Sequence, residues 1–277
     1  MTAIPTYPMN DGRTIPAIGF GTYKLRGEDG IAAMVSALRA GYRLLDTALN
    51  YGNEVEVGEA IRRSGIDRDQ IMVTTKLPGR HHGFDETLAS FEESRQHLGL
   101  DHVDLYLIHW PIPRIDKYVD SWRAMIQLRE QGLVHSIGVS NFTEEYLSRL
   151  IDETGVAPAV NQIELHPRFP QPAMRQANLS LGIVTESWSP LARQHPVDKE
   201  RVIVEIAGKH DVTPAQVVLR WHIQLGAVPV PKSASPRRQA ENLDVFGFTL
   251  TEAELLSISA LESGRLWGGD PESHEEL

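Results

Sequence analysis

The chain has 277 residues, 41% hydrophobic and 23% charged, which is enough length and apolar content for one large soluble domain. Its 37 acidic and 27 basic residues give a formal net charge of -10, which argues against nucleic acid bound through a broad basic face. The absence of cysteine excludes disulfides and thiolate chemistry, and no stretch approaches the ~20 apolar residues of a membrane span, so we expect a cytoplasmic protein with neither a membrane partner nor a metal site.

Along the chain, a short turn at 10–12 predicts an N-terminal hairpin, after which hydrophobic runs alternate with amphipathic segments. The runs cover residues 17–23, 43–48, 71–77, 104–110, 136–142, 159–165, 183–191 and 227–233. Helical patterns lie between them, for example at 30–41, 53–65, 85–99 and 143–155, several with an Asx or hydroxyl residue at the start and glycine at the end. Further helices are predicted at 236–243 and 251–262.

This alternation predicts α/β architecture, a (β/α)8 TIM barrel with an N-terminal hairpin and extra C-terminal helices. Eight strand-helix units are the number that a closed barrel requires. A doubly wound open sheet is the alternative, but it usually has fewer strands and one switch point. Because no composition break or linker divides the chain, we expect one domain over residues 1–277.

Four polar residues stand where three neighbouring predicted strands give way to loops: Asp46, Tyr51, Lys76 and His109. The carboxyl ends of parallel strands meet at one rim, so these side chains are expected to converge. An ammonium lowers the pKa of a nearby phenol, and a carboxylate keeps the lysine charged, which predicts a proton donor. The imidazole would bind a substrate oxygen or relay a proton. Each residue alone has a structural explanation, but four complementary groups together predict catalysis.

The order of motifs in the chain resembles that of the aldo-keto reductases, particularly of short prokaryotic members. The motifs are GFGTYKL (19–25), GYRLLDTALNYGNE (41–54), TTKL (74–77), LGLDHVDLYLIHWP (98–111), GVSNF (138–142), VNQIELHP (160–167) and PKS (231–233). The family's Asp-Tyr-Lys-His tetrad falls on the four rim residues. The resemblance implies hydride transfer from NADPH to an aldehyde or ketone, with Tyr51 as the proton donor.

For the cofactor, a Rossmann site is not expected, because the string at 19–21 lacks the third glycine of that motif. A barrel binds phosphate near the loops after strands seven and eight, where the basic segment KSASPRR (232–238) lies. The resemblance implies that Lys232, Ser233 and Arg238 bind the 2′-phosphate of NADPH. The other cofactor residues that it implies are Gly21, Thr22, Asp46, Ser140, Asn141, Gln162, Trp188, Ser189, Leu191, Glu241 and Asn242, although Gln162 is equally well explained as a hydrogen-bonded structural residue.

The substrate is expected to be a small aldehyde, an α-dicarbonyl or a keto-sugar, in a pocket formed by Tyr23, Leu49, His109, Trp110 and Trp267. Trp267 belongs to a Gly-rich C-terminal segment, where it is either a pocket wall or a surface anchor. Residues 78–82, PGRHH, stand where similar family members often carry tryptophan, so the particular substrate stays open. We expect the two adjacent histidines of that segment to lie in a solvent-exposed loop.

Two other functions remain as alternatives. One is a cofactor-binding regulatory subunit, and the other is a barrel hydrolase that uses Asp46 with a second carboxylate such as Glu54 or Glu186. A hydrolase would leave Lys76 and the basic segment without a role. We expect a monomer or weak dimer whose partner is the carbonyl substrate.

Overall fold

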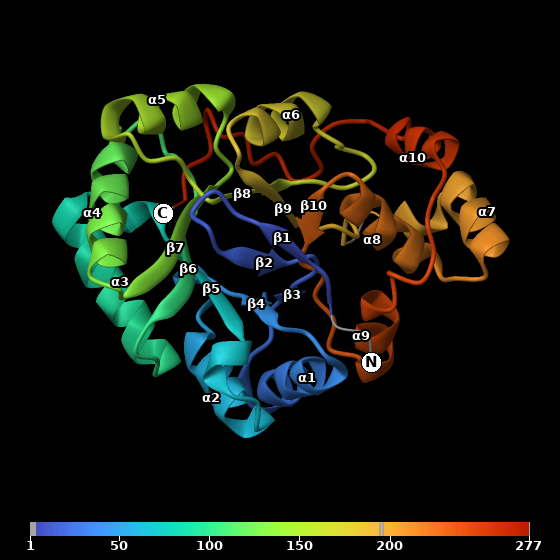
Figure 1. Ribbon diagram of the computed structural model, residues 1–277, viewed down its shortest axis with the longest axis horizontal. Coiled ribbons are helices and arrows are strands. Elements are labelled where there is room, and N and C mark those ends of the chain that lie inside the picture. The colour runs from blue at the N-terminus through green and yellow to red at the C-terminus, as the bar shows by residue number, and fades with distance from the viewer. Residues whose placement is uncertain (1–3, 194, 196, 277) are drawn as a thin grey trace.

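The computed structural model describes residues 4–193, 195 and 197–276. Within this part of the chain, eight parallel strands form a ring that helices surround (Figure 1). The strands neighbour one another in chain order: β3 (Phe20–Gly21), β4 (Leu44–Asp46), β5 (Met72–Leu77), β6 (Val103–Ile108), β7 (Val134–Ser140), β8 (Val160–Glu164), β9 (Val184–Trp188) and β10 (Ala227–Pro229).

Backbone hydrogen bonds between the first and last strands close the ring. The N–H of Gly19 donates to the carbonyl of Pro229 at 2.9 Å, and the N–H of Gly21 donates to the carbonyl of Pro231 at 3.1 Å. The sheet therefore has no open edge along this seam, as a barrel requires. The predicted (β/α)8 barrel is confirmed, and the alternative of an open doubly wound sheet is wrong.

The helices follow the strands as predicted and form the outer layer (Figure 1). One α-helix follows each of β3 to β8, namely α1 (Gly27–Ala40), α2 (Glu54–Ser64), α3 (Phe84–Leu98), α4 (Tyr118–Glu130), α5 (Glu144–Thr154) and α6 (Pro172–Ser180), and two follow β9, namely α7 (Arg201–His210) and α8 (Pro214–Gln224). After β10 comes α9 (Pro236–Leu243), which packs against α8 and α1 and so completes the outer layer, and then α10 (Glu252–Ser259), the C-terminal helix that is additional to the barrel. No helix in the described ranges is both long and apolar enough to cross a membrane.

Only some of the polar residues that precede the helices act as N-caps. Thr213, Ser235 and Thr251 accept hydrogen bonds from the first turns of α8, α9 and α10. Asn53, which precedes α2, makes no such bond; its amide donates instead to the carbonyls of Thr22 and Leu25. Asn53 therefore fixes the loop after β3 against the segment that follows β4.

The barrel interior has an apolar end and a polar end. Alternate residues of a strand point to the same side, so Leu44 and Asp46 both face inward, as do Val160 and Gln162. Leucines and valines at the amino ends pack against Met9 and Ile15 of the N-terminal hairpin, β1 (Thr6–Pro8) and β2 (Thr14–Pro16). The hairpin lies across the middle of the ring in Figure 1. Polar side chains are thereby left at the carboxyl ends.

Two helical glycines test how tightly the outer layer packs. A Cβ on Gly58 in α2 would lie 2.0 Å from the carbonyl oxygen of Leu98 at the end of α3, whereas a Cβ on Gly208 in α7 would meet no described atom within 4 Å. We expect Gly58→Ala to lower the free energy of unfolding by about 1–3 kcal/mol. Gly208→Ala should raise it by about 0.5–1 kcal/mol. Urea unfolding measures both, and equal stabilities would contradict the close helix contact.

Candidate active site

Three strand ends and one short turn bring the four predicted catalytic residues together. Asp46 is the last residue of β4, Lys76 lies in β5, and His109 directly follows β6. Tyr51 ends a 3-10 turn, Leu49–Tyr51, that follows β4. The structure brings them together on one rim: Lys76 contacts Asp46 and Tyr51, and the ring centroids of Tyr51 and His109 are 6.0 Å apart.

Lys76 is at the centre of the cluster and is fully buried. Its Nζ donates to Asp46 Oδ1 at 2.6 Å and to the Thr47 carbonyl at 2.8 Å, and it lies 3.5 Å from the hydroxyl of Tyr51. Burial alone would lower the pKa of Lys76, but Asp46, Tyr51 and Glu186 raise it above its ordinary value. The lysine is therefore a fixed ammonium that faces the phenol.

The pKa of Tyr51 differs from the prediction. Burial raises the pKa of the phenol above its ordinary value, and the field of Lys76, which lowers it, does not fully compensate. The expectation that Lys76 lowers the phenol pKa is correct for the direction of its own effect and wrong for the net result. Tyr51 therefore keeps its proton at neutral pH, and the ammonium limits the cost of releasing it.

His109 contacts the C-terminal segment, which the sequence did not predict. Glu276 Oε1 lies 2.6 Å from His109 Nδ1. The same carboxylate accepts from the amide of Asn50 at 2.6 Å and from the N–H of Gly79 at 3.1 Å. Burial would raise the pKa of Glu276, but these contacts lower it below its ordinary value. The tail thus closes one side of the site with an ionised carboxylate.

Glu186 is a buried carboxyl group that Gln162 connects to Asp46 of the tetrad. The amide of Gln162 in β8 donates to Asp46 Oδ1 at 2.9 Å and to Glu186 Oε2 in β9 at 2.6 Å. Burial, aided by Asp46 and opposed by Gln162 and Lys76, raises the pKa of Glu186 to about 8. The amide of Gln162 therefore joins two buried carboxyl groups.

Glu186 gives the cofactor-free protein an unusual pH dependence. A carboxyl with a raised pKa binds a proton on folding, so its stabilising effect is full below about pH 4.5 and is lost as the pH rises through about 8. The Glu186→Gln side chain cannot ionise. We therefore expect the unfolding free energy of this variant, minus that of wild type, to increase across this range by at most about 1.4 kcal/mol per pH unit. Urea unfolding near pH 5 and pH 8 measures it, and a pH-independent difference would count against the buried proton.

Polar residues after β7 and β9 form the next part of the rim. Asn141 donates to the His109 carbonyl at 3.0 Å and accepts from the indole of Trp188 at 2.8 Å. Ser140 donates to the Gln162 carbonyl at 2.8 Å. The hydroxyl oxygen of Ser189 is buried with no partner in the described part of the chain. These residues link the tetrad to the carboxyl ends of β7, β8 and β9.

The predicted phosphate segment follows β10 on the same rim. Lys232 is exposed and Ser233 is buried, and Ser235 caps α9 through the N–H of Arg238 at 3.5 Å. In α9, Asn242 is buried, while Glu241 accepts from the side chain of Arg237 at 2.8 Å. Gly21 in β3 lies against this segment, since a Cβ there would be 3.6 Å from Lys232 Cβ. The neighbouring Thr22 donates through its hydroxyl to the Asp46 carbonyl at 2.9 Å.

Aromatic side chains surround the mouth of the cluster. Tyr23 packs edge-on against Tyr51, with ring centroids 5.1 Å apart, and Arg193 lies over both Tyr23 and Trp267. The rings of Trp267 and Trp188 also pack together, with centroids 5.6 Å apart, so the C-terminal segment contributes to the rim. Three other predicted pocket and cofactor residues are buried or half-buried: Leu49, Trp110 and Leu191.

The prediction of a solvent-exposed histidine pair after β5 is wrong for His82. Its side chain is buried, and burial lowers its pKa to about 4. His81 is partly exposed and lies 2.9 Å from the hydroxyl of Ser90. The two neighbouring histidines therefore have different surroundings, His82 buried and His81 partly exposed beside a hydroxyl.

The fold and the rim together define a class of barrel enzymes arranged for proton transfer, and comparison with known proteins identifies the family. The family model described as Aldo/keto reductase family matches residues 17–263. The chain therefore belongs to the aldo/keto reductase family, as its motifs predicted.

Relatives and solved structures extend this result over the whole chain. The chain is 59% identical over 277 residues to 2,5-diketo-D-gluconic acid reductase B of Corynebacterium sp. (strain SHS752001), covering 100% of both proteins. It is 44% identical over 280 residues to morphine 6-dehydrogenase of Pseudomonas putida, covering 96% of this chain and 94% of that one. A structure of a Gox0644 mutant in complex with NADPH superposes with a TM-score of 0.94 at 44% identity, covering 99% and 100%.

Proposed function

We propose that the chain reduces an aldehyde or ketone with NADPH and that Tyr51 donates the proton. The observation that carries this proposal is the Lys76 ammonium, fixed by Asp46 at 2.6 Å and 3.5 Å from the Tyr51 hydroxyl. Family membership supports the reaction class, and the relatives with bound NADPH or NADP support the cofactor.

The residues between β7 and α9 fit a dinucleotide phosphate. Lys232 and Arg238 are exposed cations beside a helix start, and the unpartnered hydroxyl of Ser189 is suited to an oxygen of the pyrophosphate. Ser140, Asn141 and Gln162 would meet the carboxamide, and Trp188 the nicotinamide ring. Glu241 and Asn242 would meet the adenine. Bound NADPH supplies the hydride, and the chain supplies orientation and an acid.

Proton transfer is the contribution of the tetrad. The substrate carbonyl oxygen lies against the Tyr51 hydroxyl and His109, and Tyr51 releases its proton as negative charge develops on that oxygen. The resulting phenolate is stabilised by Lys76, whose own charge is held by Asp46. A phenol with a raised pKa is protonated before the reaction, so it is ready to act as the acid.

A small polar carbonyl compound is the substrate that we propose, of the keto-sugar, α-dicarbonyl or small aldehyde type. The name of the 59% identical relative supports a keto-sugar acid within this group. Tyr23, Leu49, Trp110 and Trp267 would form apolar walls, and His109 would hold the oxygen. We further propose that the protein is cytoplasmic and is a monomer or weak dimer.

The barrel-hydrolase alternative has little support from the contacts of its carboxyl groups. Asp46 is engaged by Lys76 and Gln162, and the raised pKa of Glu186 keeps that carboxyl protonated at neutral pH. Glu54 is buried against the hydroxyl of Thr75 at 2.6 Å. Neither Glu54 nor Glu186 is therefore placed to form a water-activating pair of carboxylates with Asp46.

The test is NADPH oxidation over a carbonyl panel that contains simple aldehydes, α-dicarbonyls, keto-sugars and keto-sugar acids. We expect loss of NADPH absorbance with at least one class and product alcohol in equal amount. NADPH binding without turnover of any carbonyl would favour the regulatory-subunit alternative. Hydrolysis of a glycoside without NADPH would favour the hydrolase.

A further inference from the structure

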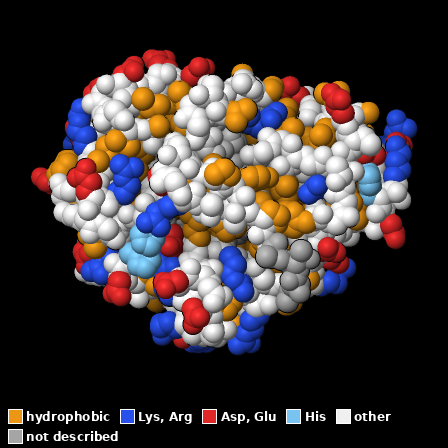
Figure 2. Space-filling view, viewed as in Figure 1, with side chains coloured by type: hydrophobic (Ala, Val, Ile, Leu, Met, Phe, Trp, Pro, Cys, Tyr) orange, Lys and Arg blue, Asp and Glu red, His pale blue; other side chains and the backbone are white. Residues whose placement is uncertain are grey.

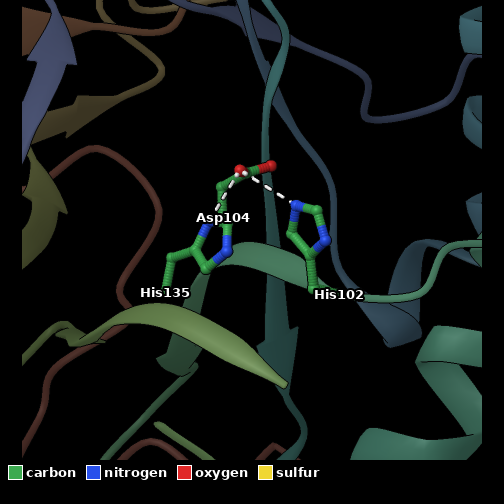
Figure 3. Close-up of side chains that lie close together, drawn as sticks. All are labelled: His102, Asp104 and His135. Atoms are coloured by element: carbon green, nitrogen blue, oxygen red, sulfur yellow. Dashed lines mark ion pairs between the residues drawn. The ribbon is translucent and has the colours of Figure 1, made fainter. Parts of the chain in front are cut away.

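Three metal-ligand side chains gather at the amino ends of β6 and β7, away from the catalytic rim (Figure 3). His102 precedes β6, Asp104 is the second residue of β6, and His135 is the second residue of β7. The parallel register pairs Val103 with Val134, so Asp104 and His135 are side by side. His109 follows the opposite end of β6, which separates this cluster from the tetrad by the length of the strand.

The nitrogen atoms of both imidazoles approach the same carboxylate oxygen. His135 Nδ1 lies 3.3 Å from Asp104 Oδ1, and His102 Nε2 lies 3.8 Å from it. The two rings stack with centroids 4.2 Å apart, and the three ligand atoms all lie within 4.8 Å of one another. Figure 3 shows both rings directed at the carboxylate from neighbouring segments. A tetrahedral ion about 2.0–2.2 Å from each ligand atom holds these atoms about 3.3–3.6 Å apart, a spacing that the two distances to Asp104 Oδ1 already approach.

Hydrogen bonds from neighbouring residues fix one oxygen of the Asp104 carboxylate, so that its other oxygen faces the imidazoles. Asp104 Oδ2 accepts from Arg68 at 2.6 Å and from the N–H of Val73 at 2.9 Å. Arg68 also donates to the carbonyls of Ile71 and His102. Partners of this kind orient metal ligands and set their basicity. Because Arg68 already offsets the charge of Asp104, the site should bind a metal less tightly than a structural zinc site does.

The cluster is accessible to an ion. All three side chains are partly exposed, and Asp104 and His135 line a hollow of about 1120 Å³ beside the N-terminal hairpin. Figure 2 shows this face, on which hydrophobic side chains surround the hairpin and charged and histidine side chains lie toward the edge. Water in the hollow can complete the coordination of an ion held by three protein atoms.

We propose that His102, Asp104 and His135 form a binding site for a divalent transition-metal ion of the zinc type. Two imidazole nitrogens and one carboxylate oxygen are ligands that such ions prefer, and the remaining position is open to water. The ion would join the start of β6 to that of β7 and would stabilise the folded protein in proportion to its occupancy. The distance from the rim means that it has no part in the reduction.

The test uses the full chain after treatment with a chelator. Co2+ is added as a spectroscopic probe, and Zn2+ binding is followed by calorimetry. We expect one ion per chain at this site, with an affinity that falls by about tenfold or more in His135→Gln and in His102→Gln. Zn2+ should also raise the melting temperature of wild type and not that of the two variants.

His210→Gln is the matched control, because His210 lies 3.1 Å from Glu254 and belongs to no group of three metal-ligand side chains among the described residues. It should bind Co2+ and Zn2+ as wild type does, and all three variants should keep wild-type turnover with NADPH. Unchanged affinity and stoichiometry in both His135→Gln and His102→Gln would overturn the proposal, since the ion would then bind elsewhere. Absence of Co2+ and Zn2+ binding to wild type would also overturn it.

Discussion

Tyr51→Phe is expected to lower the rate of carbonyl reduction by about 10² to 10⁴-fold, while NADPH affinity stays within a few-fold of wild type. The substitution removes one oxygen, the one that lies 3.5 Å from Lys76 Nζ, and keeps the ring that packs against Tyr23 and His109. An acid that acts on the forming alkoxide contributes to the transition state and not to cofactor binding. The loss should therefore appear in kcat.

The measurements are steady-state NADPH oxidation with the best carbonyl substrate and fluorescence titration with NADPH. Tyr7→Phe is a suitable control, because Tyr7 belongs to the hairpin at the other end of the barrel, where its hydroxyl donates to the Ile223 carbonyl at 2.9 Å. It should keep wild-type turnover. If Tyr51→Phe reduced the carbonyl at half the wild-type rate, another group would be the proton donor.

Sequence patterns predict this fold well because the barrel repeats one simple unit. Eight apolar runs alternate with helical segments, and each run places its last polar residues at the same rim. Asp46, Lys76 and His109 could therefore be placed together from their positions at strand ends. The limits of the strands are less predictable. In the apolar run at 17–23 only Phe20 and Gly21 form β3, because the neighbouring residues are buried as loop and not as strand.

Features that depend on distant contacts could not be predicted in this way. Glu276 reaches His109 from the end of the chain, and no local pattern links an acidic tail to a barrel rim. The net pKa of Tyr51 depends on how far burial outweighs the field of Lys76, which only the packed structure determines. The same holds for Glu186, whose raised pKa results from its place behind Asp46.

The group formed by His102, Asp104 and His135 could not be predicted from the sequence for a different reason. His102 and Asp104 are two residues apart, but His135 comes from the next strand, so the three residues have no recognisable ligand spacing. The sequence gives no reason to expect a metal site, and the parallel register of β6 and β7 is what brings the side chains together. Pairing between strands, more than motif spacing, determines such sites in a barrel.

Arg238→Ala is expected to weaken NADPH binding by about 10- to 100-fold and NADH binding by no more than a few-fold. A hydrogen bond to a charged group contributes about 1.5–3 kcal/mol, and only NADPH carries the 2′-phosphate. Arg238 is exposed in the first turn of α9, a few residues after Lys232 and Ser233 in the chain, in a protein whose formal net charge is -10. The attraction of the phosphate must therefore come from this local group of residues.

Arg237→Ala is the matched control for this prediction. The two arginines are adjacent on the same helix, but Arg237 is paired with Glu241 at 2.8 Å and is exposed, so its loss should change either affinity only slightly. Titration of wild type and both variants with NADPH and NADH, at one ionic strength, gives the ratio of affinities. Parallel losses for both cofactors in Arg238→Ala would show that the 2′-phosphate is recognised elsewhere, whereas a larger loss of NADPH in Arg237→Ala would exchange the roles of the two arginines.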